Sequence, residues 1–196
     1  MSFIDQQVGE VLATLDELGL RDNTIVVLTS DHGFNLGEHN FWGKHNMLNK
    51  ALHVPLIIDA PQKPSALTSD ALVSLVDVFP TLVDLTGLSA DEKLKQQMVG
   101  RSLSLLLTDP NTQHKPFIYS RFKEGDSVVS GQLIYTEYIT AEGKKEYMLF
   151  DLSVDPEETT NVVAQPKYQQ DIKRLSAYLE QVKKQSEAYL PRKIAG

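Results

Sequence analysis

The chain has 196 residues, with 26 acidic and 19 basic side chains, a formal net charge of −7 and no cysteine. The acidic excess argues against a nucleic-acid-binding surface, which carries clustered lysine and arginine. The lack of cysteine excludes disulfides, thiolate metal sites and a cysteine nucleophile within this sequence. No apolar run reaches the roughly 18–20 residues that cross a bilayer, so we predict no membrane span.

The first half of the chain predicts helices alternating with apolar strands. Apolar residues at helical spacing predict a helix over residues 3–18. Residues 24–29 are a β-branched run without polar alternation, which is typical of a strand buried on both faces in a parallel sheet. Residues 54–59, opened by Pro55 and closed by Pro61, predict a second buried strand. Helical periodicity over 74–87 predicts a second helix. If it begins near Asp77-Val78, Pro80 lies in its first turn, where proline is tolerated.

The last third of the chain has a different pattern. Segments 117–119, 128–138 and 146–150 predict strands of an antiparallel sheet, with a hairpin turn at Glu142-Gly143 between the last two. Apolar residues on one helical face predict a terminal helix over 168–189.

These elements predict an α/β fold in two parts. Residues 1–115 form an α/β domain, and residues 116–196 form a small antiparallel subdomain with a terminal helix.

Polar chemistry is concentrated in segment 30–50, which is rich in histidine, asparagine and glycine and has no regular period. A loop of this length is typical of a functional segment. Asp31 follows a predicted strand, at the sheet edge where open α/β sheets bind ligands. Asp31 beside His32 is a pair that can ligate a metal, and Gly33 lets the backbone turn sharply away. Lys44 supplies a positive charge suited to phosphate or sulfate.

Each of these residues also has a purely structural interpretation. An Asp-His-Gly sequence at a strand end suits a turn with a capping aspartate. Trp42, the only tryptophan, suits packing. His39 and His45 suit surface or loop-packing positions, and Lys44 suits a solvated surface position.

Seven segments share a pattern with one enzyme family. The specific ones are 22–33, 36–39, 42–45 and 53–58, and the less specific ones are 75–82, 100–103 and 149–159. In these segments the sequence resembles the type I sulfatases of the alkaline-phosphatase-like superfamily. The Asp31-His32 pair and His53-Val54-Pro55 resemble iduronate-2-sulfatase-like enzymes most. The resemblance implies an incomplete sulfatase-like sheet with helices, followed by the antiparallel subdomain.

The resemblance also implies roles for individual residues. Asp31 and His32 would bind the active-site divalent cation, usually Ca²⁺; Lys44 would contact the sulfate as a catalytic group; Lys44 and His45 would bind substrate. The implied reaction is hydrolysis of a sulfate ester, and the implied substrate is a sulfated sugar or other sulfated small molecule. Because calcium prefers oxygen ligands, His32 could instead touch the sulfate or favour a softer metal.

Two positions depart from the family pattern. Asn40 stands where glycine is more usual, and Asn49-Lys50 stands where an acidic pair is common. These departures leave the exact substrate open, but they do not affect the metal carboxylate.

The family nucleophile is a formylglycine made from cysteine or serine in a Cys/Ser-x-Pro-x-Arg motif. None of the residues two positions before the nine prolines is cysteine or serine, so the motif is absent. The family's N-terminal aspartate pair is absent too. We therefore expect this chain to be the C-terminal half of a sulfatase, whose missing N-terminal half supplies the formylglycine. The family implies a periplasmic, secreted or lysosomal location.

Two other functions remain open at this point. A phosphatase or phosphonate hydrolase of the same superfamily can bind zinc through an Asp-His pair at a strand end. A non-catalytic fragment or accessory subunit would only complete, or interfere with, a partner chain.

Overall fold

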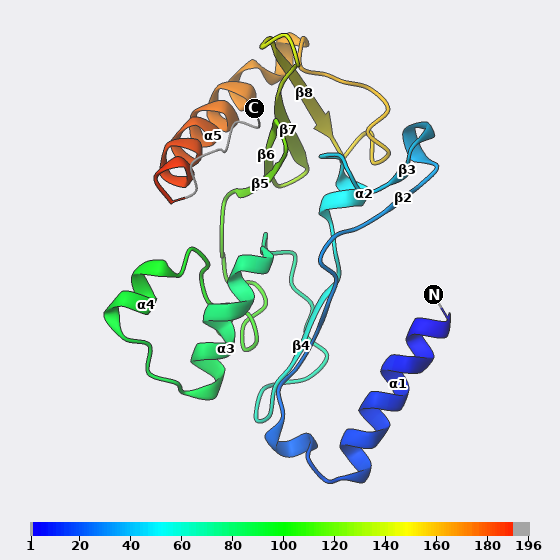
Figure 1. Cartoon of the computed structure of the whole chain (residues 1–196), viewed down its shortest axis with the longest axis vertical. Coiled ribbons are helices and arrows are strands. Elements are labelled where there is room, and N and C mark those ends of the chain that lie inside the picture. Colours follow the sequence, from blue (N-terminus) through cyan, green and yellow to red (C-terminus); the bar gives the residue numbers. More distant parts are fainter. Residues whose placement is uncertain (1, 190–196) are drawn as a thin grey trace. The chain divides into compact units, whose positions relative to one another are not determined.

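The computed structural model describes residues 2–189, with side chains up to residue 185 (Figure 1). It divides into two compact units, each considered by itself. Unit 1 comprises Met1–Ser30, Pro55–Asp70 and Leu75–Thr112, and unit 2 comprises Asp31–Val54, Ala71–Ser74 and Gln113–Gly196. The expected C-terminal subdomain therefore extends past Tyr189 into residues outside this description. No helix in the described part of the chain is long and apolar enough to cross a membrane.

Unit 1 contains three α-helices and two strands. In chain order they are α1 (Ser2–Glu17), β1 (Val26–Thr29), β4 (Leu56–Asp59), α3 (Val78–Thr86) and α4 (Glu92–Gln97). Short 3₁₀ turns at Arg21–Asn23 and Leu75–Asp77 precede β1 and α3. Helix α3 begins where expected, so Pro80 does lie in its first turn. Helix α4 was not predicted; Asp91 caps it by accepting a hydrogen bond from the Leu94 amide at 2.7 Å.

The pairing of β1 with β4 corrects the expectation of a parallel sheet. The two strands run antiparallel, with Val26 opposite Asp59 and Thr29 opposite Leu56. Nor are they buried on both faces within the described chain, because Ile57 is 60% exposed. The apolar runs identified the strands, but strand direction depends on how the chain returns to the sheet, which hydrophobicity does not encode.

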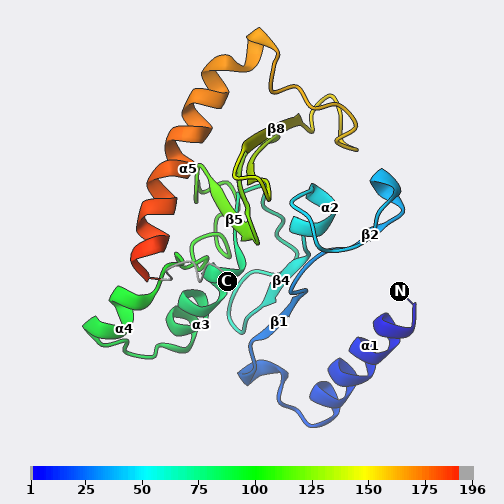
Figure 2. The same cartoon turned by 45° about the horizontal axis from the view of Figure 1, so that its top comes forward.

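Helix α1 confirms the predicted element but buries none of its residues. Figures 1 and 2 both show it standing away from β1 and β4. Phe3, Ile4, Val11 and Leu18 are between 61% and 71% exposed. An amphipathic helix normally buries its apolar stripe, so this stripe has no cover within the described residues.

The segment after α4 is fastened to the start of α3. Buried Asp77 accepts a hydrogen bond from the Arg101 amide at 2.7 Å, and the Thr81 hydroxyl accepts one from the Leu103 amide at 2.8 Å. A Cβ atom on Gly100 would lie 1.8 Å from the Val76 carbonyl oxygen. Residues 100–103 therefore have a structural role, since only glycine permits this approach.

Unit 2 is built on a four-stranded antiparallel sheet in the order β5-β6-β7-β8. Its elements are β2 (Asn35–Leu36), β3 (Trp42–Gly43), α2 (Asn49–Leu52), β5 (Ile118–Phe122), β6 (Gly125–Ser130), β7 (Leu133–Ile139), β8 (Lys145–Asp151) and α5 (Gln169–Tyr189), with 3₁₀ turns at Glu38–Asn40 and Pro166–Tyr168.

The prediction of one strand over 128–138 was wrong. That stretch forms the end of β6 and most of β7, joined by a tight turn in which Gly131 has a φ of 59°. Apolar residues on both sides of the turn hid the break. The expected hairpin turn at Glu142-Gly143 is confirmed, with Gly143 at a φ of 77° between β7 and β8.

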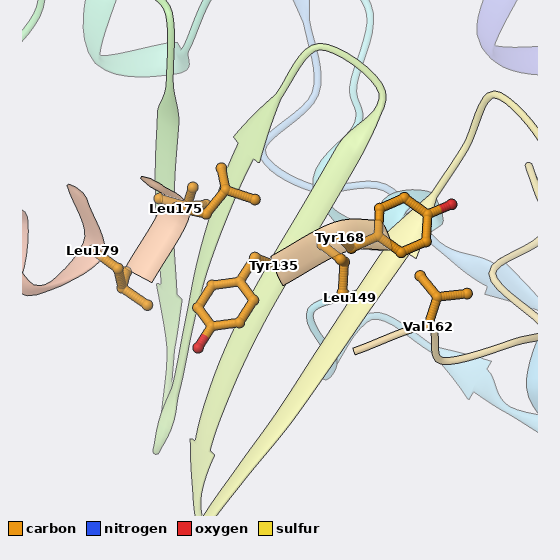
Figure 3. Packing of buried hydrophobic residues seen from close by; sticks show 7 residues of the cluster. Tyr135, Leu149, Val162, Tyr168, Leu175 and Leu179 are labelled. Atoms are coloured by element: carbon orange, nitrogen blue, oxygen red, sulfur yellow. The ribbon is translucent and has the colours of Figure 1, made fainter. Parts of the chain in front are cut away.

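Helix α5 covers one face of this sheet, and their contact forms the core of unit 2 (Figures 2 and 3). The buried cluster comprises Val128, Tyr135, Leu149, Val162, Tyr168, Leu175 and Leu179. The rings of Phe117 and Tyr178 stack beside it at 4.4 Å between centroids. The predicted apolar face of the helix is thus the face that packs on the sheet.

A buried charged cluster also ties α5 to the sheet. The Lys183 ammonium lies 2.6 Å from a Glu137 carboxylate oxygen and 3.6 Å from one of Asp126. Asp126 also accepts hydrogen bonds from Arg121 at 2.6 Å and from the Tyr119 hydroxyl at 2.7 Å. Burial opposes ionisation of Asp126, but the Arg121 and Tyr119 hydrogen bonds and nearby positive charges outweigh it and lower its pKa.

Candidate active site

The segment predicted to be a functional loop contains a small antiparallel hairpin. Strands β2 and β3 pair Asn35 with Gly43 and Leu36 with Trp42. The fully buried Asn35 side chain donates to the Gly43 carbonyl at 3.1 Å and so fastens the hairpin. Residues just before β2 and just after β3 therefore meet, which brings Lys44 to His32 across 12 positions of sequence.

Asp31, His32 and Lys44 lie together, as expected from the sequence. The Lys44 ammonium is hydrogen-bonded to Nε2 of His32, and a carboxylate oxygen of Asp31 lies 3.4 Å from the same nitrogen. On the other side of the ring, Nδ1 lies 2.7 Å from the Gly33 carbonyl oxygen. That oxygen only accepts, so Nδ1 carries the proton and Nε2 presents a lone pair to Lys44.

This arrangement favours a cation beside Nε2 of His32 and the Asp31 carboxylate, because both groups can donate an electron pair. A carboxylate oxygen of Asp31 lies 3.4 Å from Nε2 of His32, and the Asp31 side chain is 82% exposed. The bond from Nδ1 to Gly33 fixes the ring orientation, as the outer bond of a metal-bound histidine commonly does.

The metal fit is partial. The described residues contain no cluster of three or more His, Cys, Asp or Glu side chains that could hold a metal ion. Calcium takes about 6–8 oxygen ligands, so the side chains of Asp31 and His32 would supply only part of a cation's coordination shell.

Gly33 is required for a different reason from the one expected. The Gly33 amide donates a hydrogen bond to the Ala51 carbonyl at 2.9 Å, so the backbone at Gly33 lies directly against α2. A Cβ atom on Gly33 would lie 2.0 Å from the Lys50 carbonyl oxygen. The glycine thus permits close approach of two backbones, and the position of α2 sets the position of the neighbouring His32.

Three other residues singled out in the sequence each have their own environment. The ring of His45 stacks on Phe122 of β5, with 5.4 Å between centroids and 9° between planes. Trp42 is 72% exposed, so the expectation that it packs into the structure was wrong. Asn40 has a φ of 56°, and asparagine is one of the few residues other than glycine that tolerate this conformation. The backbone therefore explains why glycine is usual there.

Sequence reasoning missed Glu158. Its side chain is buried, and one carboxylate oxygen accepts a hydrogen bond from the Asn49 amide at 2.8 Å. The two residues are 109 positions apart. No local pattern reveals such a contact, although Glu158 lies within segment 149–159, which resembled the family.

Comparisons with known proteins agree with this architecture. Residues 1–88 match the family model described as Sulfatase. Mouse arylsulfatase K is 34% identical over 173 residues, which cover 82% of this chain and 31% of that protein. The chain thus spans about a third of the length of this curated relative.

Two solved structures extend the match over nearly the whole chain. One, in complex with its substrate D-glucosamine-2-N,6-O-disulfate, has a TM-score of 0.85 and 27% identity, covering 98% of this chain and 40% of that one. The other, a phosphonate monoester hydrolase of Agrobacterium radiobacter, has a TM-score of 0.75 and 26% identity, covering 95% and 40%. Residues 1–88 are thus similar in sequence to the sulfatase family, and the fold of the chain is similar to part of these two enzymes.

Proposed function

We propose that this chain is the C-terminal part of a sulfatase that hydrolyses sulfate esters of sugars and is of the iduronate-2-sulfatase-like type. The observation that carries the proposal is the meeting of Asp31, His32 and Lys44 just after β1, within the segment that matches the family model. A sugar sulfate is favoured because a structural neighbour binds D-glucosamine-2-N,6-O-disulfate as its substrate.

In this proposal Asp31 and His32 hold a divalent cation, Ca²⁺, together with ligands from the N-terminal half. When bound, the cation would polarise the sulfate group. The Gly33 carbonyl keeps the Nε2 lone pair of His32 available by accepting a hydrogen bond from Nδ1. Nε2 has a single lone pair, so a cation bound there would displace the Lys44 ammonium from His32. The N–H donors of Lys44 would then bond a sulfate oxygen and offset its charge. His45, held by Phe122, would line the substrate side.

The nucleophile comes from outside this chain in the same proposal, as a formylglycine on the N-terminal half. We therefore expect the 196-residue chain alone to release no sulfate from an aryl sulfate or from glucosamine 6-O-sulfate. Reconstituted with a half that carries the Cys/Ser-x-Pro-x-Arg motif, it should release sulfate. Asp31→Ala should then lower kcat/KM at least about 100-fold, as loss of a transition-state charge contact does.

The matched control is Asp22→Ala, which removes an exposed carboxylate from the turn before β1 and should leave the rate unchanged. Sulfate release by the chain alone, abolished by Asp31→Ala, would reveal a nucleophile within these residues and overturn the two-part scheme.

Phosphonate or phosphate ester hydrolysis is the second candidate. It is favoured by the structural neighbour that is a phosphonate monoester hydrolase and by the imidazole donor of His32, which suits zinc better than calcium. Metal analysis of the reconstituted enzyme separates the two: bound calcium with sulfate release supports the sulfatase, and bound zinc with phosphonate hydrolysis supports the alternative.

The same proposal assigns a partner to the exposed stripe of α1 and to the open edges of the two-stranded β1–β4 sheet, namely the N-terminal half of the fold. Without it, exposed apolar surface and strand edges favour association. We expect the isolated chain to sediment as an oligomer and to bind a dye for apolar surface, and the N-terminal half to suppress both. A clean monomer that binds no dye would contradict this and favour an accessory protein.

A further inference from the structure

We propose that Glu158 is a positioning residue of the candidate active site, which holds α2 in place so that α2 in turn fixes Gly33 and the His32 ring. The role of Glu158 in catalysis rests on the proposed function. The coupling of Glu158 to the His32 ring through α2 does not. The chain of contacts runs from Glu158 to Asn49, through one turn of helix to Ala51, and from there to Gly33.

The first link is the hydrogen bond from the Asn49 amide to Glu158, at 2.8 Å. Asn49 opens the four-residue helix α2, and Leu48, which precedes it, makes no side-chain cap. The Glu158 carboxylate thus takes the place of a cap for an amide that the helix itself leaves unbonded. A second, weaker contact joins Lys50 to Glu157 at 3.5 Å, where both side chains are substantially exposed.

The second link joins α2 to the site. The Gly33 amide donates to Ala51, and the Gly33 Cα approaches the Lys50 carbonyl too closely to leave room for a Cβ atom. Such tight backbone contact transmits displacement, because neither partner can move without the other. The Gly33 carbonyl is also the acceptor that orients His32. A shift of α2 therefore changes the direction of the Nε2 lone pair.

Glu158 is held in an energetically unfavourable environment, which indicates that its contact with Asn49 is a structural constraint and not incidental. Its side chain is 3% exposed, and its second carboxylate oxygen has no hydrogen-bond partner among the described residues. Its backbone has a φ of 55°, which is uncommon for glutamate. Burial raises the pKa of Glu158 against the opposing effects of the Asn49 amide and His39, with Asp155 and Glu157 adding to the rise.

The test reads the His32 ring directly, by ¹⁵N NMR of the imidazole nitrogens in the 196-residue chain, without metal or sulfate. Wild type should show Nδ1 protonated and Nε2 unprotonated, with slow exchange of the Gly33 amide. Glu158→Ala should accelerate Gly33 exchange at least about 10-fold and average the ring signals between tautomers. Glu158→Gln should restore the wild-type pattern, because its amide oxygen still accepts from Asn49.

Asn49→Pro removes the donor of the same hydrogen bond, whereas Glu158→Ala removes its acceptor. Proline is tolerated at the first position of a helix and lacks the N–H that donates to Glu158, so this variant should reproduce the Glu158→Ala pattern even if the alanine variant folds poorly. Glu146→Gln, at an exposed position of β8, is the matched control and should change neither signal.

Unchanged His32 signals and Gly33 exchange in a folded Glu158→Ala or Asn49→Pro variant would overturn the proposal. So would an equal effect of the control Glu146→Gln. Neither result would affect the sulfatase assignment, which is tested separately by sulfate release and Asp31→Ala.

Discussion

Replacing Lys183 by methionine should destabilise the chain by about 3–5 kcal/mol, the usual result of removing one partner from a buried ion pair. The ammonium lies between the buried carboxylates of Glu137 and Asp126, and its side chain is only 15% exposed. Methionine retains most of the apolar stem but leaves the Glu137 carboxylate with the Tyr135 hydroxyl as its remaining donor in the described structure. Urea unfolding followed by circular dichroism measures the loss.

The pH dependence of this loss has a definite sign. Because the Asp126 pKa is lowered in the folded state, its ionised form contributes stability above the usual carboxyl pKa, and that stability disappears as pH falls through the folded value. The difference between wild type and Lys183→Met should therefore be largest near neutral pH and shrink in acid. Lys184→Met, at the exposed neighbouring position, should stay within about 0.5 kcal/mol of wild type. A pH-independent loss would contradict the electrostatic explanation.

Gly33→Ala should disrupt the candidate site with a smaller loss of stability, about 1–3 kcal/mol, as overpacking of a close contact does. The added Cβ atom would lie 2.0 Å from the Lys50 carbonyl oxygen, and a backbone oxygen cannot rotate away as a side chain can. The two segments must separate, so the hydrogen bond from Gly33 to Ala51 and the contact of His32 with Lys44 should weaken together. Unfolding and the His32 ring signals measure the two effects.

The matched control for this substitution is Gly9→Ala in α1. A Cβ atom there meets nothing within 4 Å, and alanine is favoured over glycine inside a helix by about 1 kcal/mol. This variant should therefore be neutral or slightly more stable, with unchanged His32 signals. If Gly33→Ala behaved in the same way, the close approach of α2 to Gly33 would not be a constraint.

The candidate site illustrates which contacts are local enough to predict. Asp31 and His32 were identifiable because they are adjacent and follow an apolar strand. Lys44 was expected beside them, and a hairpin that the sequence did not reveal brings it there. Glu158 could not be found, because a hydrogen bond across 109 positions depends on the packing of a distant loop.

Local chemistry in the sequence by itself determined where most helices and strands lie, because apolar periodicity, proline and glycine act within a few residues. It predicted α1, α3 and α5, the apolar strands β1 and β4, and the turn at Gly143. Only the tertiary structure decided that β1 and β4 run antiparallel, that 128–138 is a hairpin, and that α1 remains uncovered in the described chain. Strand direction, register and burial depend on which distant segments pack together. The same apolar residue is compatible with a parallel or an antiparallel strand and with a covered or an uncovered face, so its identity does not decide between them.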